Sequence, residues 1–238
     1  MKKLELLFPE LCNIYAESYN VTYLQKSCKE LEVIETRHTD KPAFVSEDVD
    51  MIYLGCASER KQEQIIEILR PYKNRIVELI DKGVVFLVTG NACEIFGKSI
   101  KDEDRIIDGL GIFDFNAVRD LNGERHNSQY VGTFTDDNGE SILMLGHRSQ
   151  FSFSYGDFEQ NKFIDIEIGI GMNPETKAEG LYKNNFFATY SLGPYLIMNP
   201  LFAKYLLRKI GVDDSLAFEK EAVEAYEYRR DELRKNLG

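Results

Sequence analysis

Residues 83–97 read Gly-Val-Val-Phe-Leu-Val-Thr-Gly-Asn-Ala-Cys-Glu-Ile-Phe-Gly, and this stretch decides the fold. The run from Val84 to Thr89 is almost wholly apolar, which is typical of a strand covered on both faces. The small residues that follow favour a sharp turn and the start of a helix. In α/β enzymes such a turn mounts a nucleophile beside backbone N–H groups that receive an oxyanion. Here the residue at the turn is Gly90, so the unit lacks a reactive side chain.

Strands and helices alternate before and after this unit. Residues 31–36 and 48–55 have strand-like patterns, and residues 59–82 carry apolar side chains at helical spacing, interrupted by Pro71. Strand, turn, helix and strand in this order imply a parallel sheet with right-handed crossovers. We therefore expect an α/β fold with a flavodoxin-like core, in which helices flank a mostly parallel central sheet.

The second half of the chain predicts an antiparallel extension of that sheet. Its strand-like segments are residues 129–134, 141–145, 163–170 and 186–190, and turn sequences such as Asp-Asp-Asn-Gly at 136–139 separate them. Two helices are expected at the end, one from Asn199 to Ile210 with Gly211 after it, and a charged one within 214–237. We expect one domain over residues 1–211, with the charged segment 212–238 packed on it or extending from it.

Composition limits the function classes. The 238-residue chain has a net charge of −11 and a sequence pI near 4.9, which argues against nucleic acid as a partner because phosphate binding needs clustered Lys and Arg. No apolar run approaches the roughly 20 residues of a membrane span, and the N-terminus does not resemble a signal peptide. The four cysteines show neither C-x-x-C spacing nor a metal pattern, so we expect reduced thiols, a cytoplasmic location and no metal or other cofactor.

Five short blocks resemble the class I glutamine amidotransferases of the cobyric acid synthase type. Within that family the chain looks most like the glutaminase subunits of lipid II isoglutaminyl synthase. The blocks keep the family's order and span nearly the whole chain. They are L-F-P-E-L-C-N-I-Y at 7–15, L-G-C-A-S-E-R-K-Q at 54–62, G-L-G-I-F-D-F at 109–115, E-G-L-Y-K-N at 179–184 and A-T-Y-S-L-G-P at 188–194.

The resemblance implies a cysteine nucleophile at the strand–helix elbow and a histidine base in the last block. By position, the family's C-G-G-Y-Q-L-L-G becomes residues 90–97 and its G-T-Y-L-H-G-P becomes residues 188–194. The nucleophile position is therefore Gly90, and the base position is Leu192. Neither side chain can perform the thiolate attack and proton transfer that amide cleavage needs.

Other positions near the elbow also differ from the family. Cys56 stands where the family has a glycine, and Ala16-Glu17-Ser18-Tyr19-Asn20 replaces a G-D-x-G-N loop, keeping an acid at Glu17. Because glycine adopts backbone conformations that other residues resist, we expect that the family's loop geometry is no longer required. The remnant pocket is expected to comprise Glu17, Gly55, Cys56, Arg60, Gly90, Asn91 and Leu192.

A displaced nucleophile is the alternative. Cys93 lies three residues past the elbow, where a helix N-terminus could lower the pKa of its thiol, and Cys56 is a second candidate. Both also fit as small buried residues. His147 and Arg148 lie near a family motif, G-F-x-N-H-G-G, whose own histidine falls at about Gln150, and we expect both to be surface polar groups. Residues 102–104 are expected to form a solvated loop.

Three functions follow from these observations. The first is a glutamine amidotransferase-like protein that has lost glutaminase activity and binds a small ligand or a partner through the remnant pocket. The second is an active amidotransferase or hydrolase with a relocated nucleophile, Cys93 or Cys56, in cell-wall precursor amidation or cobalamin-type biosynthesis. The third is a subunit that docks beside a synthetase, because the family's glutaminase subunit works with a Mur-ligase-like partner.

Overall fold

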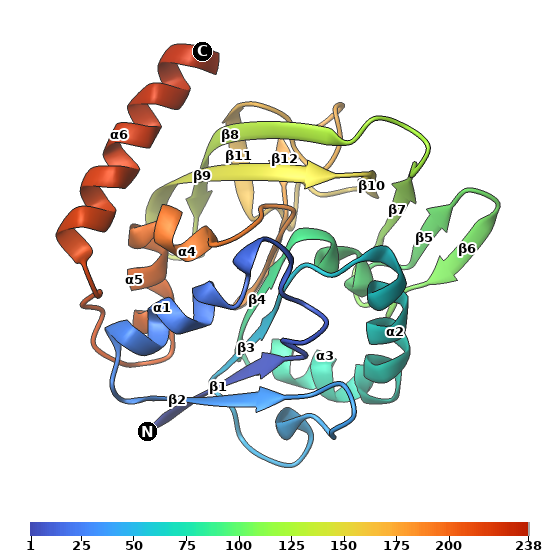
Figure 1. Cartoon of the computed structure of the whole chain (residues 1–238), viewed down its shortest axis with the longest axis horizontal. Helices are drawn as coiled ribbons and strands as arrows, with labels where there is room; N and C mark the ends of the chain where they lie inside the picture. The colour runs from blue at the N-terminus through green and yellow to red at the C-terminus, as the bar shows by residue number, and fades with distance from the viewer. Residues whose placement is uncertain (238) are drawn as a thin grey trace.

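The computed structural model describes residues 1–237, and its centre is a six-stranded sheet in the order β13-β14-β4-β3-β1-β2 (Figure 1). Its strands are β1 (Lys2–Leu7), β2 (Leu31–Thr36), β3 (Met51–Leu54), β4 (Val85–Thr89), β13 (Leu181–Lys183) and β14 (Phe186–Thr189). All neighbouring pairs are parallel except β13 with β14. The parallel order β2-β1-β3-β4-β14 is that of flavodoxin-like proteins, so the expected fold class is confirmed.

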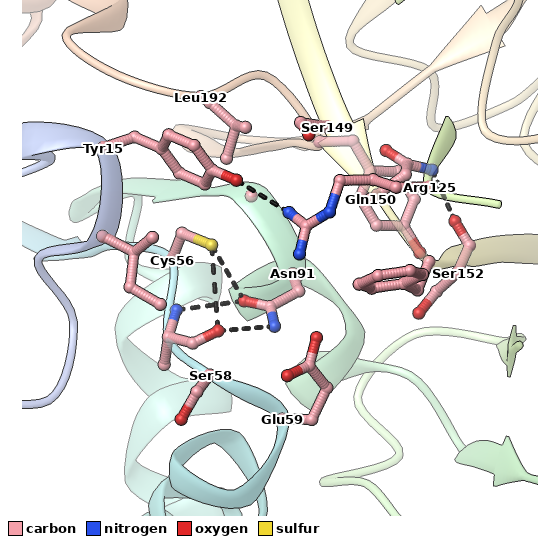
Figure 2. Close-up of a pocket in the computed structure, with 15 residues that line it drawn as sticks. Tyr15, Cys56, Ser58, Glu59, Asn91, Arg125, Ser149, Gln150, Ser152 and Leu192 are labelled. Atoms are coloured by element: carbon pink, nitrogen blue, oxygen red, sulfur yellow. Dashed lines mark hydrogen bonds between the residues drawn. The ribbon is translucent and has the colours of Figure 1, made fainter. Parts of the chain in front are cut away.

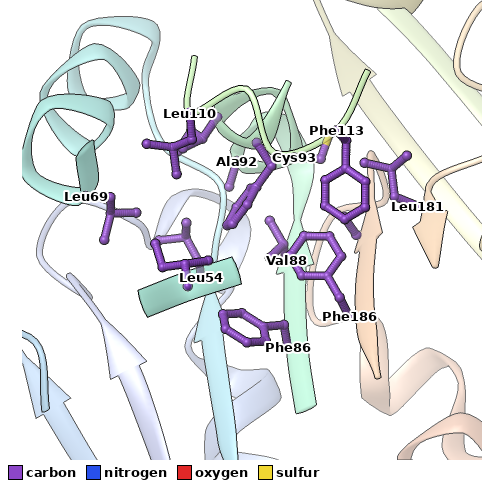
Figure 3. Close-up of a cluster of buried hydrophobic side chains, with 14 of the residues drawn as sticks. Leu54, Leu69, Phe86, Val88, Ala92, Cys93, Leu110, Phe113, Leu181 and Phe186 are labelled. Atoms are coloured by element: carbon purple, nitrogen blue, oxygen red, sulfur yellow. The ribbon is translucent and has the colours of Figure 1, made fainter. Parts of the chain in front are cut away.

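The side chains of β4 explain why the central sheet is buried on both faces. Alternate residues of a strand point to opposite faces. Phe86 and Val88 pack into one hydrophobic core, and Val85 and Leu87 pack into another, each with at most 2% of its surface exposed. Figure 3 shows the first core, where the segment after β4 brings Ala92 over the same face. Burying each large apolar side chain contributes about 1.5–3 kcal/mol, so β4 anchors the elbow that follows it.

Helices cover the two faces of this sheet (Figure 1). On one face lie α2 (Glu59–Leu69) and α3 (Lys73–Asp81), and on the other lie α1 (Tyr19–Ser27), α4 (Tyr195–Met198) and α5 (Pro200–Lys209). A short 3-10 turn, η3 (Arg70–Tyr72), separates α2 from α3 at Pro71. The interruption expected from the sequence is therefore confirmed, because proline cannot supply the N–H that a continuous helix needs.

Asn199 precedes α5 as expected, but its side chain does not cap the helix. Its side chain instead accepts a hydrogen bond from the Leu145 N–H at 2.8 Å and donates one to the Leu145 carbonyl at 2.9 Å. The helix ends before Gly211, whose φ of +77° suits glycine. The Asn199 side chain therefore joins α5 to strand β9 (Ser141–Gln150), while its backbone carbonyl accepts hydrogen bonds from the N–H groups of Phe202 and Ala203 in the first turn of α5.

The second half of the chain contributes β14, which is parallel, and β13, which is the antiparallel extension, to the central sheet. Its other strands within residues 1–237 form two further sheets. One sheet has the order β10-β7-β5-β6, and the other has the order β12-β11-β8-β9. The strands are β5 (Ser99–Asp102), β6 (Arg105–Asp108), β7 (Phe115–Arg119), β8 (His126–Thr135), β9 (Ser141–Gln150), β10 (Ser152–Gly156), β11 (Ile164–Ile168) and β12 (Ala178–Glu179). The expected hairpin at residues 136–139 joins β8 to β9, where the Asp136 carboxylate accepts hydrogen bonds from the N–H groups of Asn138 and Glu140.

Residues 103–104 form the exposed turn that the sequence predicts, but Asp102 does not belong to it. Asp102 is the last residue of β5 and is only 6% exposed. Its carboxylate lies 3.3 Å from the buried Arg119 guanidinium and 2.5 Å from Arg105. Two cations therefore hold this acid at the end of a hairpin, and only the tip of the run faces solvent.

The C-terminal helix α6 (Glu219–Leu237) packs against strands β8 and β9, and Figure 1 shows it at the side of the molecule, beside one end of these strands. Ala222, Tyr226 and Leu233 recur on one face and are buried, and the Tyr226 hydroxyl donates to the Leu143 carbonyl at 2.9 Å. The other faces carry the charged side chains that the composition of the segment predicts. Within residues 1–237, no helix is both long enough and apolar enough to cross a membrane.

Candidate functional site

The chain turns sharply at Gly90, at the carboxyl end of β4. Gly90 has a φ of +64°, a left-handed conformation that strains any residue with a side chain. The next segment, η4 (Gly90–Phe96), is a 3-10 helix and not the α-helix expected from the sequence. One reason is that the Asn91 carbonyl, which an α-helix would bond to Ile95, accepts a hydrogen bond from the Gln62 side chain.

The space beside Gly90 is already filled. A Cβ atom added at Gly90 would lie 2.6 Å from the Cys56 Cβ, 3.0 Å from the Cys56 Sγ and 3.0 Å from the Leu192 Cδ2. Real Cβ atoms do not approach other atoms to 2.6 Å, so a side chain at position 90 requires Cys56 to move. The Gly90 N–H also donates to the Ser191 carbonyl at 3.1 Å. The structure therefore brings together three of the positions singled out in the sequence: Cys56, Gly90 and Leu192.

A cavity of about 200 Å³ opens at this point (Figure 2). Of the expected pocket residues, Cys56, Gly90, Asn91 and Leu192 line it. Gly55 and Glu17 lie behind these residues, where the Glu17 Cβ is 2.9 Å from an ideal Cβ at Gly55. Arg60 is exposed on α2 and does not line the cavity.

The cavity is also lined by residues that the sequence analysis did not include in the expected pocket. Tyr15, Arg125 and Gln150 enter the cavity from three different segments of the chain. The Arg125 guanidinium lies 4.4 Å from the Phe151 ring centroid, and it donates to the Tyr15 hydroxyl at 2.7 Å. The Gln150 Oε1 is buried and has no hydrogen-bond partner within residues 1–237. Two of them had a signal in the sequence: Tyr15 ends the first family block, and a family motif places its histidine near Gln150.

Burial raises the pKa of both candidate thiols, the opposite of what activates a cysteine. Desolvation, and secondly the nearby Glu17 charge, raise the pKa of Cys56 to about 12, while its Sγ lies 3.3 Å from the Asn91 Oδ1. Cys93 is fully buried against the sheet, and burial raises the pKa of its thiol well above the ordinary value. The expectation that a helix N-terminus could lower the pKa of Cys93 is wrong, because the segment is a buried 3-10 turn.

Glu17 joins the backbone segments that flank Gly90 and Leu192. Its fully buried carboxylate accepts hydrogen bonds from the hydroxyls of Tyr53 and Thr89, each at 2.5 Å, and from the Gly193 N–H at 2.7 Å. Burial raises the pKa of Glu17 to about 7, an effect that these hydrogen bonds only partly offset.

The loop before Glu17 keeps a left-handed backbone without glycine. Tyr15 has φ +63° and Ala16 has φ +58°. Of the two positions where the family has glycine, Ala16 is therefore left-handed without one, whereas Tyr19 begins helix α1. Left-handed backbone in a residue with a side chain costs about 1–2 kcal/mol, and the anchored Glu17 on one side and buried Cys12 on the other hold the loop in place.

No histidine lines the cavity. His38 pairs with Glu10 at 2.7 Å, and His126 packs on the Phe153 ring at 5.1 Å between centroids. The His147 backbone carbonyl accepts a hydrogen bond from the Leu192 N–H at 2.9 Å, but its side chain does not line the cavity. That side chain is half-buried, and burial lowers its pKa.

Arg148 is not a surface group. It is fully buried, and its guanidinium lies 3.0 Å from the Glu179 carboxylate and also donates to two backbone carbonyls. Because side chains alternate along strand β9, Arg148 points inward and its neighbour His147 points to the opposite face.

Among residues 1–237 there is no group of three or more metal-ligating side chains.

Comparisons with known proteins show what the sequence and the fold are similar to. Residues 4–199 match the CobB/CobQ-like glutamine amidotransferase domain. The chain is 25% identical over 217 residues to subunit GatD of the glutamine-hydrolyzing lipid II isoglutaminyl synthase of Staphylococcus aureus, covering 89% of this chain and 85% of that protein. It is 23% identical over 222 residues to the GatD subunit of Streptococcus pneumoniae, covering 88% and 82%. In fold it is similar to PurLQS of Thermotoga maritima, with a TM-score of 0.53, 13% identity, and coverage of 96% of this chain and 99% of the other.

Proposed function

The chain belongs to the CobB/CobQ-like glutamine amidotransferase family, and we propose that it has lost glutaminase activity and acts as a ligand-binding or partner-docking subunit. The packing around Gly90 carries this proposal. A family nucleophile at this position needs room for its side chain, and that room is taken by the Cys56 Cβ, 2.6 Å from where a Cβ at Gly90 would lie. The absence of a thiol at the elbow is therefore matched by the packing of its neighbours.

The base position supports the same proposal. Leu192 contributes an apolar Cδ2 at 3.0 Å from the same point and has no group that accepts a proton. Thiolate attack on an amide requires a positioned proton acceptor and donor. With no imidazole among the residues that line the cavity, amide hydrolysis by the family mechanism has neither of its two reacting side chains.

A relocated nucleophile is the alternative function, and Cys56 is its better candidate because it lines the cavity. A thiol with a pKa of about 12 has only about one molecule in 10⁵ as thiolate at pH 7. Reactive cysteines lie beside cations or helix N-termini that lower the pKa, whereas Glu17 raises it here. Cys93 is the weaker candidate nucleophile because it lies in the hydrophobic core.

A glutaminase assay on the purified protein tests both functions. We expect no ammonia release above the background of a Cys56→Ser variant. We also expect no covalent adduct at Cys56 or Cys93 when the intact protein is treated with an electrophilic glutamine analogue and analysed by mass spectrometry. Ammonia release that disappears in C56S or Cys93→Ser would overturn the loss of activity and establish the alternative.

The cavity supports binding without hydrolysis. Arg125 has no carboxylate partner within residues 1–237, and its guanidinium faces the cavity (Figure 2). The unpartnered Gln150 Oε1 adds an acceptor that a ligand N–H or O–H group can satisfy. A thermal-shift titration with L-glutamine is expected to raise the midpoint with no ammonia formed, and an unchanged midpoint would argue for partner docking instead.

The curated relatives are subunits of a synthetase, so we propose that this chain docks beside a Mur-ligase-like synthetase in the cytoplasm. All four cysteines are free, which suits a reducing compartment. Affinity purification of the tagged chain from its source cell tests this: recovery of a Mur-ligase-like protein in equal amount is expected. Recovery of the chain alone would count against the partner while leaving the lost activity untouched.

A further inference from the structure

We propose that Tyr15 and Arg125 form a latch that holds a strap, residues 13–16, closed over the cavity and so controls entry to it. This inference rests on the proposed function only in treating the cavity as a place where a ligand binds. It concerns two side chains to which the family resemblance assigns no role, and it starts from one hydrogen bond that joins two segments 110 residues apart.

The strap is the exposed part of an otherwise anchored loop. All four residues from Asn13 to Ala16 are exposed, whereas Cys12 and Glu17 on either side are buried. Glu17 is fixed by its hydrogen bonds to Tyr53, Thr89 and Gly193. The strap can therefore swing about two fixed ends without disturbing the core.

Its backbone is strained in the closed position. Tyr15 and Ala16 both have positive φ, at +63° and +58°, although neither is glycine. Such conformations persist only where surrounding contacts hold them, and they cluster at moving and ligand-binding segments. Asn13 bonds to Ser18 within the loop, so the contact that reaches across the cavity is the one made by Tyr15.

That contact lies at the mouth of the cavity. Figure 2 shows the Tyr15 hydroxyl directed at the Arg125 guanidinium, with Cys56 on the cavity wall close to the tyrosine. Arg125 is itself held against the Phe151 ring, 4.4 Å from its centroid. The phenol oxygen is 2.7 Å from the Arg125 Nη1, so one hydrogen bond to a charged group connects the strap to the opposite rim. Breaking it would release the strap while Arg125 keeps its stacking contact.

Cys56 makes the opening measurable without knowledge of the ligand. Within residues 1–237 it is the one cysteine that lines the cavity, while Cys12 is buried at the base of the strap and Cys28 and Cys93 are buried elsewhere. We would follow the rate at which iodoacetamide labels Cys56 in the native protein by mass spectrometry of its peptide. Labelling of Cys28 and Cys93 reports opening of the whole fold, and a C56S variant identifies the reacting site.

Tyr15→Phe removes only the latch hydroxyl. Labelling of Cys56 is expected to accelerate by about tenfold, because a hydrogen bond to a charged group shifts an opening equilibrium by about that factor. Tyr19→Phe is the matched control, since Tyr19 is 57% exposed nearby and its hydroxyl has no hydrogen bond within residues 1–237. The rate in Y19F is expected to equal that of the unmodified protein.

A double-mutant cycle separates a latch from two independent effects. Arg125→Gln is expected to accelerate labelling on its own, and Y15F combined with R125Q is expected to label no faster than R125Q alone. Equal rates in Y15F and Y19F, or a parallel rise in Cys28 labelling, would overturn the latch. Such a result would not affect the proposed loss of glutaminase activity. Ammonia release by the purified chain would overturn that proposed loss and would leave these labelling rates unchanged.

Discussion

The Glu17 carboxylate accepts a hydrogen bond from the backbone N–H of Gly193, 2.7 Å away and 176 residues further along the chain. The same side chain accepts a hydrogen bond from the Thr89 hydroxyl. Thr89 precedes Gly90, and Gly193 follows Leu192, so one buried acid holds the backbone beside both substituted positions. The frame that surrounds the two positions is therefore kept although their reactive side chains are absent.

The pH dependence of stability should report on Glu17. Burial raises its pKa to about 7 from the ordinary 4.5, so between these values the folded chain holds a proton that the unfolded chain has released. The contribution of this group to stability is therefore complete below pH 4.5 and is lost as the pH rises through 7. Glu17→Gln cannot titrate, so its stability relative to the unmodified protein should rise by up to about 3 kcal/mol between pH 5 and 8.

Urea unfolding at several pH values measures this difference. Glu32→Gln, the same substitution at an exposed position on β2, is the comparison variant. A constant difference between E17Q and the unmodified protein across the range would mean that Glu17 titrates in the folded state as it does in the unfolded chain.

Gly90→Ala should destabilise the fold by about 2–4 kcal/mol. About 1 kcal/mol comes from the left-handed backbone, and about 1–3 kcal/mol from overpacking against Cys56. Gly139→Ala is the matched control, because Gly139 also has positive φ, at +85°, but no atom lies within 4 Å of its added Cβ. G139A should therefore show only the backbone component, near 1 kcal/mol.

The packing part of this effect has a specific partner. Adding Cys56→Gly to G90A removes the Cβ that lies 2.6 Å away, so the two substitutions should couple favourably by about 1–2 kcal/mol in a double-mutant cycle. If G90A and G139A prove equally destabilising, or if C56G adds its own effect independently, the space beside Gly90 is not occupied in the way described above.

Arg148→Met should destabilise the protein by about 3–5 kcal/mol, because it leaves the buried Glu179 carboxylate without its cation. Arg234→Met is a suitable comparison, since Arg234 pairs with Glu167 at 3.3 Å where both side chains are nearly half exposed. Exposed pairs contribute about 0–1 kcal/mol. Similar losses in the two variants, measured by urea unfolding, would show that the Arg148 pair is not insulated from solvent.

Much of the fold, and the two substituted positions of the site, can be predicted from local sequence patterns. The apolar run of β4 and the proline between α2 and α3 are short-range signals, and the structure matches them. Gly90 and Leu192 could be singled out because each lies inside a block whose neighbours resemble the family. Their proximity then follows from β4 and β14 being adjacent parallel strands with a common carboxyl edge.

The remaining features depend on tertiary contacts that no local pattern reports. Arg148 looks like a surface residue because charged side chains are rarely buried without a partner, and its partner Glu179 lies 31 residues away. Tyr15 and Arg125 meet across 110 residues of chain. The 3-10 turn after Gly90 depends on a hydrogen bond from Gln62 of α2. Each of these requires knowing which segments come together.

Restoring the two reactive side chains and the space between them should restore reactivity toward glutamine. The variant combines Gly90→Cys, Cys56→Gly and Leu192→His. The new thiol can use the space that the Cys56 side chain occupies. The imidazole replaces a side chain whose Cδ2 lies 3.0 Å from the Cβ position of residue 90. Glu17 would continue to hold the backbone on both sides. We expect an electrophilic glutamine analogue to form an adduct at position 90, detected by mass spectrometry of the peptide.

The comparison variant is G90C with C56G and an unchanged Leu192, which has the thiol and the space but no base. Its adduct should form at least about tenfold more slowly, because a positioned base contributes about 10²–10⁴-fold when it acts in the reaction. G90C alone should give a destabilised protein and no adduct, since Cys56 still occupies the space. A folded triple variant that reacts no faster than the comparison variant would show that Leu192 does not stand where a base could serve the elbow.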